Sequence, residues 1–209
     1  MNHSDLLAPE LYNMAQDIDR FADDPKKVAL IWTNEDGDTQ KVTYLQLRKQ
    51  SNRFANALQR MGLKTGEKVM VTLPRIPETY AIYLGALKLG LIISPGSEML
   101  REKDLLYRAE HSQAKATICI DTMTDRFDQI RESTSIEYFI SVGKEVEGWS
   151  HYNQLLKGES EQFEMVQTRS DDIAFLNYTS GTTGNPKGVI HPHSWLMLIK
   201  LSQPNYGLM

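Results

Sequence analysis

The sequence predicts an α/β fold in which strands and helices alternate on a largely parallel sheet. Short apolar runs rich in Val and Ile, typical of buried strands, are separated by longer stretches whose apolar residues recur at helical spacing. The links between them are short, which indicates strand–helix–strand units. In such sheets ligands bind outside the carboxyl ends of the strands. We therefore expect a functional site where one of these strands ends.

The N-terminal part is expected to form a helix and then a hairpin. Apolar residues recur at helical spacing up to Phe21, after the candidate caps Ser4 and Asp5; they are Leu6, Leu7, Leu11, Met14, Ile18 and Phe21. Strands over residues 28–33 and 41–44 flank a turn-forming segment. Thr43 and Gln46 then form the pattern of a capping box, which opens a helix that Gly62 ends.

The remaining elements follow the alternation in order. The expected strands cover residues 68–73, 91–94, 116–120, 138–142 and 173–178, and the expected helices cover residues 77–87, 102–113, 125–132 and 149–156. Residues 158–169 are polar enough to form a surface connection. A last helix is expected over residues 189–201.

The strongest candidate site is the segment between the last expected strand and the last expected helix. It reads Thr179-Ser-Gly-Thr-Thr-Gly-Asn-Pro-Lys-Gly188. Glycines let main-chain N–H groups approach an anion closely, while four hydroxyl side chains and Lys187 add donors and charge. The dipole of the expected helix would also favour an anion. This composition predicts a phosphate-binding loop, and a mobile Ser/Thr/Gly linker is the alternative.

Two common phosphate-binding motifs do not fit this segment. A Walker A loop requires Lys directly after its second glycine and then Ser or Thr, whereas Lys187 precedes Gly188. The dinucleotide fingerprint requires two glycines separated by one residue, and Gly181, Gly184 and Gly188 are spaced more widely. The loop is therefore of another kind.

Composition narrows the class of protein. The chain has 209 residues, a net charge of −4 and scattered basic residues, so it lacks the basic surface expected of a nucleic-acid-binding protein. Apolar runs are too short for a membrane span, and the first residues do not resemble a signal peptide. Cys119 is the single cysteine and lies in an apolar run, typical of a buried thiol in a reducing compartment. These features predict a cytoplasmic protein.

No catalytic residue and no metal ligand are assigned from the pattern. His191 and His193 are too few for a zinc site and are expected to serve in packing or capping. The acidic pairs at 145/147 and 171/172 come without a set of partner ligands. Ser180 lies among hydroxyls suited to phosphate and is not expected to act as a nucleophile.

The segment Tyr178-Thr-Ser-Gly-Thr-Thr-Gly-Asn-Pro-Lys-Gly188 resembles the signature loop of the AMP-forming adenylate-forming enzymes, which include acyl-CoA synthetases. The resemblance implies that ATP activates a carboxylic acid as acyl-AMP, and that the acyl group then passes to a thiol. ATP with Mg²⁺ and coenzyme A would be the co-substrates. It also implies that the ATP phosphates contact Thr179, Ser180, Gly181, Thr182, Thr183, Gly184, Asn185, Pro186 and Lys187.

Within that family the chain resembles medium-chain acyl-CoA synthetases most, on residues 73–78, on residues 94–108, and on residues 147–150 leading into 155–156. This implies an acid–thiol ligase for short- or medium-chain fatty acids, straight or branched. The resemblance covers only the first part of the family's length. The adenine-binding Tyr-Gly-x-Thr-Glu segment, the ribose-binding aspartate, the hinge and the C-terminal domain with the adenylation lysine do not occur in residues 1–209.

Residues 1–209 are therefore expected to be an incomplete N-terminal portion of an AMP-dependent synthetase domain that ends just after the phosphate loop. Adenylation needs several donors and a metal placed together, so the chain is expected to be inactive alone. Apolar surface that the remainder would cover is expected to be exposed. A non-catalytic module that binds a nucleotide or a partner is the alternative function.

Overall fold

A seven-stranded sheet forms the centre of the protein, in a computed structural model that describes residues 8–179 and 185–197. The strand order is β7-β6-β5-β3-β4-β8-β9, and all neighbours are parallel except β8 and β9. The strands are β3 (Lys68–Thr72), β4 (Ile92–Pro95), β5 (Ala116–Ile120), β6 (Tyr138–Val142), β7 (Ser150–His151), β8 (Ile173–Thr179) and β9 (Lys187–Pro192). The predicted α/β class with a largely parallel sheet is confirmed.

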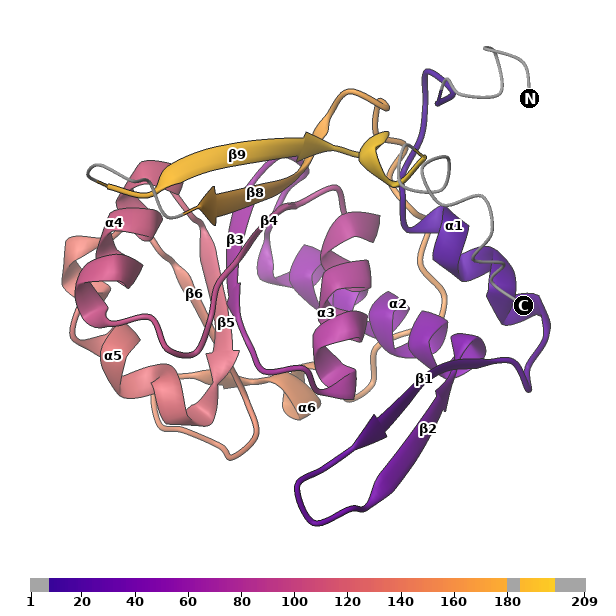
Figure 1. Ribbon diagram of the computed structural model, residues 1–209, viewed down its shortest axis with the longest axis horizontal. Helices are drawn as coiled ribbons and strands as arrows, with labels where there is room; N and C mark the ends of the chain where they lie inside the picture. Colours follow the sequence, from indigo (N-terminus) through magenta and orange to yellow (C-terminus); the bar gives the residue numbers. More distant parts are fainter. Residues whose placement is uncertain (1–7, 180–184, 198–209) are drawn as a thin grey trace.

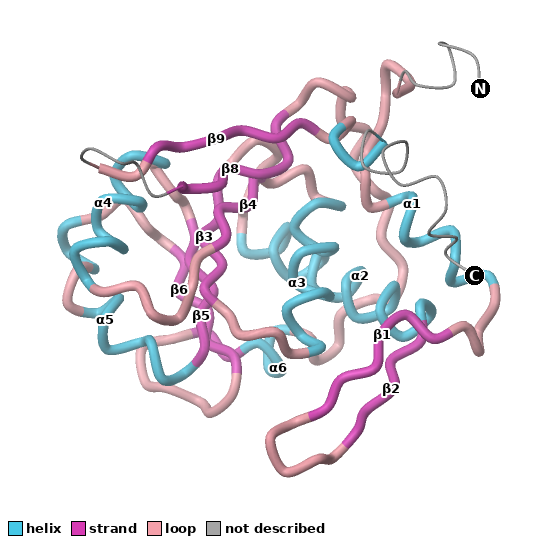
Figure 2. Tube along the Cα trace, viewed as in Figure 1, coloured by secondary structure: helices cyan, strands magenta, loops and turns pink. Residues whose placement is uncertain are grey.

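Helices cover both faces of this sheet (Figures 1 and 2). α2 (Tyr44–Met61) and α3 (Pro77–Lys88) lie on one face, and α4 (Glu102–Ser112) and α5 (Thr124–Asp128) lie on the other. Successive strand residues point to opposite faces, so Val69 and Val71 belong to the core under α2 and α3, while Met70 belongs to the core under α4 and α5. Burial on both faces explains why the strands read as nearly continuous apolar runs.

Two local predictions at the start of the chain are confirmed. β1 (Val28–Thr33) and β2 (Thr39–Thr43) form a separate antiparallel hairpin. The backbone N–H of Gln46 donates to Oγ1 of Thr43, and the backbone N–H of Thr43 donates back to Oε1 of Gln46, so the capping box is complete. Gly62 ends α2 with φ of 101°, a conformation that suits glycine.

The predicted N-terminal helix is shorter than its apolar spacing suggested. Only α1 (Gln16–Asp19) and a 3₁₀ turn over Arg20–Asp23 are helical, and residues 1–7 lie outside the described part. Residues 10–12 run antiparallel to residues 168–170, with the Tyr12 N–H donating to the Thr168 carbonyl at 2.8 Å. Backbone bonds to a distant segment thus replace those of a helix.

Two further helices are also shorter than expected. α5 ends at Asp128, and a 3₁₀ turn over Arg131–Ser133 follows it. The predicted helix over residues 149–156 is split, because Ser150–His151 pairs with β6 as β7 before α6 (Tyr152–Leu155) begins. In the second case pairing at the sheet edge takes the residues that would have started the helix.

The largest difference from expectation lies after the glycine-rich loop. Residues 187–192 form β9, which pairs antiparallel with β8, and helical residues appear only at 195–197. The prediction of a helix starting at Val189 is wrong. Residues 198–201 of that predicted helix lie outside the described part. Pairing with β8 satisfies the backbone groups of β9 without a helix.

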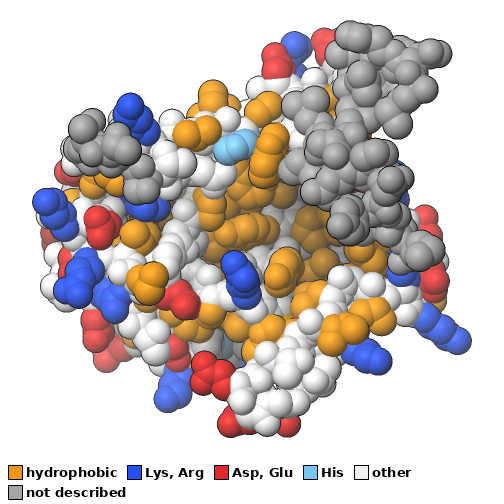
Figure 3. Space-filling model, in the orientation of Figure 1, with side chains coloured by type: hydrophobic (Ala, Val, Ile, Leu, Met, Phe, Trp, Pro, Cys, Tyr) orange, Lys and Arg blue, Asp and Glu red, His pale blue; other side chains and the backbone are white. Residues whose placement is uncertain are grey.

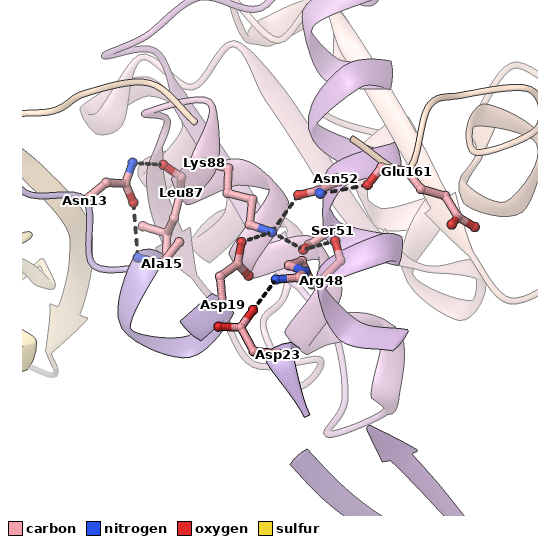
Figure 4. Close-up of polar contacts among 10 residues, drawn as sticks. All are labelled: Asn13, Ala15, Asp19, Asp23, Arg48, Ser51, Asn52, Leu87, Lys88 and Glu161. Carbon is pink, nitrogen blue, oxygen red and sulfur yellow. Dashed lines mark hydrogen bonds and ion pairs between the residues drawn. The ribbon is translucent and has the colours of Figure 1, made fainter. Parts of the chain in front are cut away.

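A buried lysine that the sequence analysis did not identify joins the first three helices (Figure 4). Lys88, the last residue of α3, is fully buried. Its ammonium lies 2.8 Å from a carboxylate oxygen of Asp19 and donates to Oγ of Ser51 and Oδ1 of Asn52 at 2.8 and 2.7 Å. Burial lowers the pKa of Lys88, and the Asp19 carboxylate opposes this shift.

An apolar hollow of about 580 Å³ lies between the N-terminal segment, α3 and β8. Its walls include Met14 and Ile18 from the N-terminal segment, Tyr83 from α3, Phe175 from β8 and Trp195. Figure 3 shows apolar side chains gathered in this region. We refer to this surface as the apolar hollow.

Candidate functional site

The hairpin of β8 and β9 carries the predicted phosphate loop. Thr179 is the last residue of β8, Lys187 is the first residue of β9, and the two are partners in the sheet register. Asn185 is exposed and Pro186 is half-buried. The other predicted phosphate contacts, Ser180, Gly181, Thr182, Thr183 and Gly184, lie outside the described residues. The structure therefore brings the two ends of the loop together.

The electrostatics of this loop differ from the sequence-based expectation. Because β9 follows the loop directly, the helix that was expected over residues 189–201 cannot supply its dipole to an anion. The exposed ammonium of Lys187 stays at the loop end. Positive charge at this end of the loop therefore comes from a side chain and not from a helix terminus.

The loop ends lie at the carboxyl edge of the sheet, where a ligand site was expected. β8 runs parallel to β4, with Phe175 opposite Ile93, so Thr179 and the end of β4 are at the same edge. A second hollow, of about 600 Å³, lies at this edge and is lined by residues 73–75 and 95–98. At Gly96 a Cβ would lie 2.5 Å from Cγ2 of Thr72. Only glycine fits at this position, because the chain passes so close to β3 as it leaves β4.

Side chains of α4 contact both ends of the loop. The Tyr107 hydroxyl donates to the carbonyl oxygen of Pro186 at 3.0 Å, and Nδ1 of His111 lies 2.8 Å from the hydroxyl of Tyr178. The guanidinium of Arg108 lies 5.0 Å from the centre of the Tyr178 ring. Burial raises the pKa of Tyr178, so its hydroxyl keeps its proton at neutral pH. Figure 1 shows α4 next to this end of the hairpin.

Sequence reasoning missed this contribution of α4. The available signal was the spacing of Tyr107 and His111, which puts two aromatic rings on one face of a helix. Their rings stack with centroids 5.6 Å apart. That spacing does not reveal which strand the rings contact.

The two histidines after the loop pack and hydrogen-bond within the hairpin region. Nδ2 of Asn177 donates to Nδ1 of His191 at 3.1 Å, across the two strands. Nδ1 of the buried His193 accepts the backbone N–H of Met14 at 3.2 Å, which ties the N-terminal segment to the end of β9. Burial lowers the pKa of His193 to about 4, so the ring is neutral at pH 7.

Other reactive or charged groups offer little for catalysis or metal binding. Cys119 is buried between sheet and helices, and burial raises the pKa of its thiol above the usual range, which leaves it unreactive. Among residues 8–179 and 185–197, no group of three or more His, Cys, Asp or Glu side chains could hold a metal ion. Within these ranges, no helix is long and apolar enough to cross a membrane.

The family model described as AMP-binding enzyme matches residues 18–203. The chain belongs to this family. The match includes the whole glycine-rich loop and confirms the resemblance drawn from residues 178–188. The hairpin and the loop ends described above lie within the matched residues.

Curated relatives extend this result. The uncharacterized acyl-CoA ligase YtcI of Bacillus subtilis (strain 168) is 38% identical over 195 residues, which are 93% of this chain and 36% of that protein. The mitochondrial acyl-coenzyme A synthetase ACSM5 of Homo sapiens is 34% identical over 212 residues, which are 97% of this chain and 35% of that protein. The chain thus spans about a third of the length of these relatives.

Solved structures agree with the fold. The acyl-CoA synthetase of Brucella canis superposes with a TM-score of 0.83 at 27% identity, covering 92% of this chain and 36% of that one. The anthranilate CoA ligase AuaEII, crystallised with anthranoyl-AMP, superposes with a TM-score of 0.85 at 26% identity, covering 100% of this chain and 39% of that one. The fold of this chain is therefore similar to part of these two ligases.

Proposed function

We propose that the chain supplies the ATP phosphate-binding loop of an AMP-forming acyl-CoA synthetase. The observation that carries the proposal is the hairpin that holds the two ends of residues 179–187 together at the carboxyl edge of the sheet. Further support comes from the family match and from relatives that are named acyl-CoA ligases or synthetases. The anthranoyl-AMP held by a similar structure is the kind of intermediate that the proposal requires.

The full-length enzyme would activate a short- or medium-chain fatty acid as acyl-AMP and pass the acyl group to coenzyme A. In this chain, residues 179–187 would contact the ATP phosphates through hydroxyl groups, main-chain N–H groups and the Lys187 ammonium. Residues 8–179 and 185–197 hold no cluster suited to a metal ion, so we assign Mg²⁺ to no residue there. A cytoplasmic location stays a prediction, since the relatives include both a bacterial protein and mitochondrial enzymes.

We also propose that the 209-residue chain does not adenylate an acid by itself. Charge develops on several phosphoryl oxygens in the transition state, and its stabilisation requires many donors placed together. The described residues offer the two ends of one loop and the side chains of α4 that contact them. The apolar hollow is the surface that the rest of a full-length enzyme would cover, because a hollow with so many apolar side chains is unfavourable in water.

Calorimetric titration with ATP and Mg²⁺, together with pyrophosphate exchange, tests both proposals. We expect saturable binding of ATP and no acid-dependent exchange of pyrophosphate into ATP. Lys187→Gln should weaken ATP binding about 10-fold, because it removes one charge-assisted contact worth about 1.5 kcal/mol. Lys41→Gln, on the exposed face of β2, is the matched control and should bind as the wild type does.

The outcomes separate the two proposals. Acid-dependent exchange by the 209-residue chain would refute inactivity and leave the loop assignment intact. No binding of ATP by a chain with the expected circular dichroism spectrum would refute the loop assignment. Equal weakening by Lys187→Gln and Lys41→Gln would attribute the effect to net charge and refute a specific contact.

A further inference from the structure

One helix holds both ends of the loop. Tyr107 and His111 lie one turn apart on α4, and each contacts a residue at one end of the loop. The Tyr107 hydroxyl binds the Pro186 carbonyl, on the side that follows the loop, at 3.0 Å. His111 binds the Tyr178 hydroxyl, on the side that precedes the loop, at 2.8 Å. The two rings stack with an interplanar angle of 26°, so they form one unit against the hairpin.

The contact with Pro186 is specific to this position. Proline has no backbone N–H, so its carbonyl is its single main-chain hydrogen-bonding group. Pro186 lies just before the first register pair of the hairpin, Thr179 with Lys187. The Tyr107 hydroxyl therefore fixes a peptide group that the strand ladder does not reach.

Gly188 in β9 leaves room for side chains of α4 to pack against the hairpin. At Gly188 a Cβ would lie 3.0 Å from Cδ1 of Leu176 and 3.4 Å from Cε1 of His111, so glycine gives these side chains room. The Arg108 guanidinium lies 5.0 Å from the centre of the Tyr178 ring. The Tyr107 and Tyr178 rings meet edge to face at 6.3 Å. Packing, cation–π attraction and two hydrogen bonds thus act on the same two loop ends.

We propose that Tyr107 is a positioning residue for the ATP phosphates, acting by fixing Pro186 and so the end of the loop that carries Lys187. The inference rests on the proposed function of the loop. Donor groups such as the Lys187 ammonium bind an anion well only when the backbone that carries them is already oriented, because ordering it on binding costs conformational entropy. With Pro186 fixed by Tyr107, less entropy is lost when a phosphate binds at Lys187. Removing the hydrogen bond from Tyr107 to Pro186 should therefore weaken binding of phosphates in particular.

The test compares Tyr107→Phe with the wild-type 209-residue chain. Phenylalanine keeps the ring that stacks on His111 and removes only the hydroxyl. We expect the Kd for ATP with Mg²⁺ and the Kd for inorganic tripolyphosphate to rise by the same factor, about 3- to 10-fold, the loss expected for one neutral hydrogen bond. Tyr80→Phe, on α3 with 43% of Tyr80 exposed, is the matched control and should leave both constants unchanged.

The Kd for tripolyphosphate is the quantity that a purely structural role of Tyr107 would leave unchanged. If Tyr107 served only to stabilise the fold, Tyr107→Phe would lower the unfolding midpoint and leave both Kd values as they are, which would overturn the inference. Equal effects of Tyr107→Phe and Tyr80→Phe would overturn it as well. If the wild type binds neither ATP nor tripolyphosphate, the proposed function fails and the inference fails with it. If the wild type binds both ligands and Tyr107→Phe leaves both Kd values unchanged, the inference fails and the proposed function stands.

Discussion

Two lysines with equally short ion pairs are expected to differ widely in their contribution to stability. Nζ of Lys88 lies 2.8 Å from Asp19, and Nζ of Lys49 lies 2.8 Å from Glu161. The side chains of Lys88 and Asp19 are 0% and 18% exposed, whereas those of Lys49 and Glu161 are 45% and 39% exposed. The two ion pairs therefore have the same length and differ in how deeply their side chains are buried.

Lys88→Met keeps most of the buried volume and removes the charge. The carboxylate of Asp19 and the polar groups of Ser51 and Asn52 then lose their common partner inside the protein. Leaving one buried charge unpaired costs about 3 to 5 kcal/mol, a large part of the stability of an ordinary domain. Lys49→Met should cost less than about 1 kcal/mol, because solvent screens that pair and Arg53 also binds Glu161.

Urea unfolding, followed by tryptophan fluorescence and far-ultraviolet circular dichroism, measures these differences. The double variant Lys88→Met with Asp19→Leu removes the stranded carboxylate, so it should be more stable than Lys88→Met alone by about 1 to 3 kcal/mol. A cost for Lys88→Met no larger than that for Lys49→Met would refute the reasoning. So would a double variant that is less stable than Lys88→Met.

Three further predictions concern pH, a helix cap and a close contact. Between pH 6.5 and about 4 the unfolded chain protonates His193 while the folded chain does not, so folding stability should fall as pH drops, by about 3 kcal/mol in total. His193→Asn keeps an acceptor for the Met14 N–H, and urea titrations at pH 7 and 4.5 should show a smaller loss for it than for the wild type. Thr43→Ala should destabilise the protein by about 1 kcal/mol in thermal unfolding, because it opens the capping box of α2; a change below about 0.3 kcal/mol, on the order of an exposed substitution, would contradict this. Gly96→Ala should cost about 1 to 3 kcal/mol from the contact with Cγ2 of Thr72, and adding Thr72→Ser, which removes that methyl group, should restore part of the loss in the same assay.

The sequence by itself determined the elements whose cause is local. The apolar runs at residues 68–72 and 116–120 became buried parallel strands, and Thr43 with Gln46 capped α2 as their spacing predicted. The glycine-rich segment is recognisable from its residues alone, because its predicted function depends on residue types that are adjacent in the chain. Such features follow from covalent neighbours, which the sequence states directly.

Elements that depend on distant partners could be known only after folding had brought those partners together. Residues 187–192 became β9 because β8 offers its backbone groups for pairing, and residues 10–12 left the helical pattern because residues 168–170 bind them. Lys88 is a buried structural cation because Asp19 and two side chains of α2 converge on it. Tyr107 reaches Pro186 across 79 residues of chain. The free energy of a hydrogen bond or a buried charge depends on what surrounds it after folding, and local spacing does not contain that information.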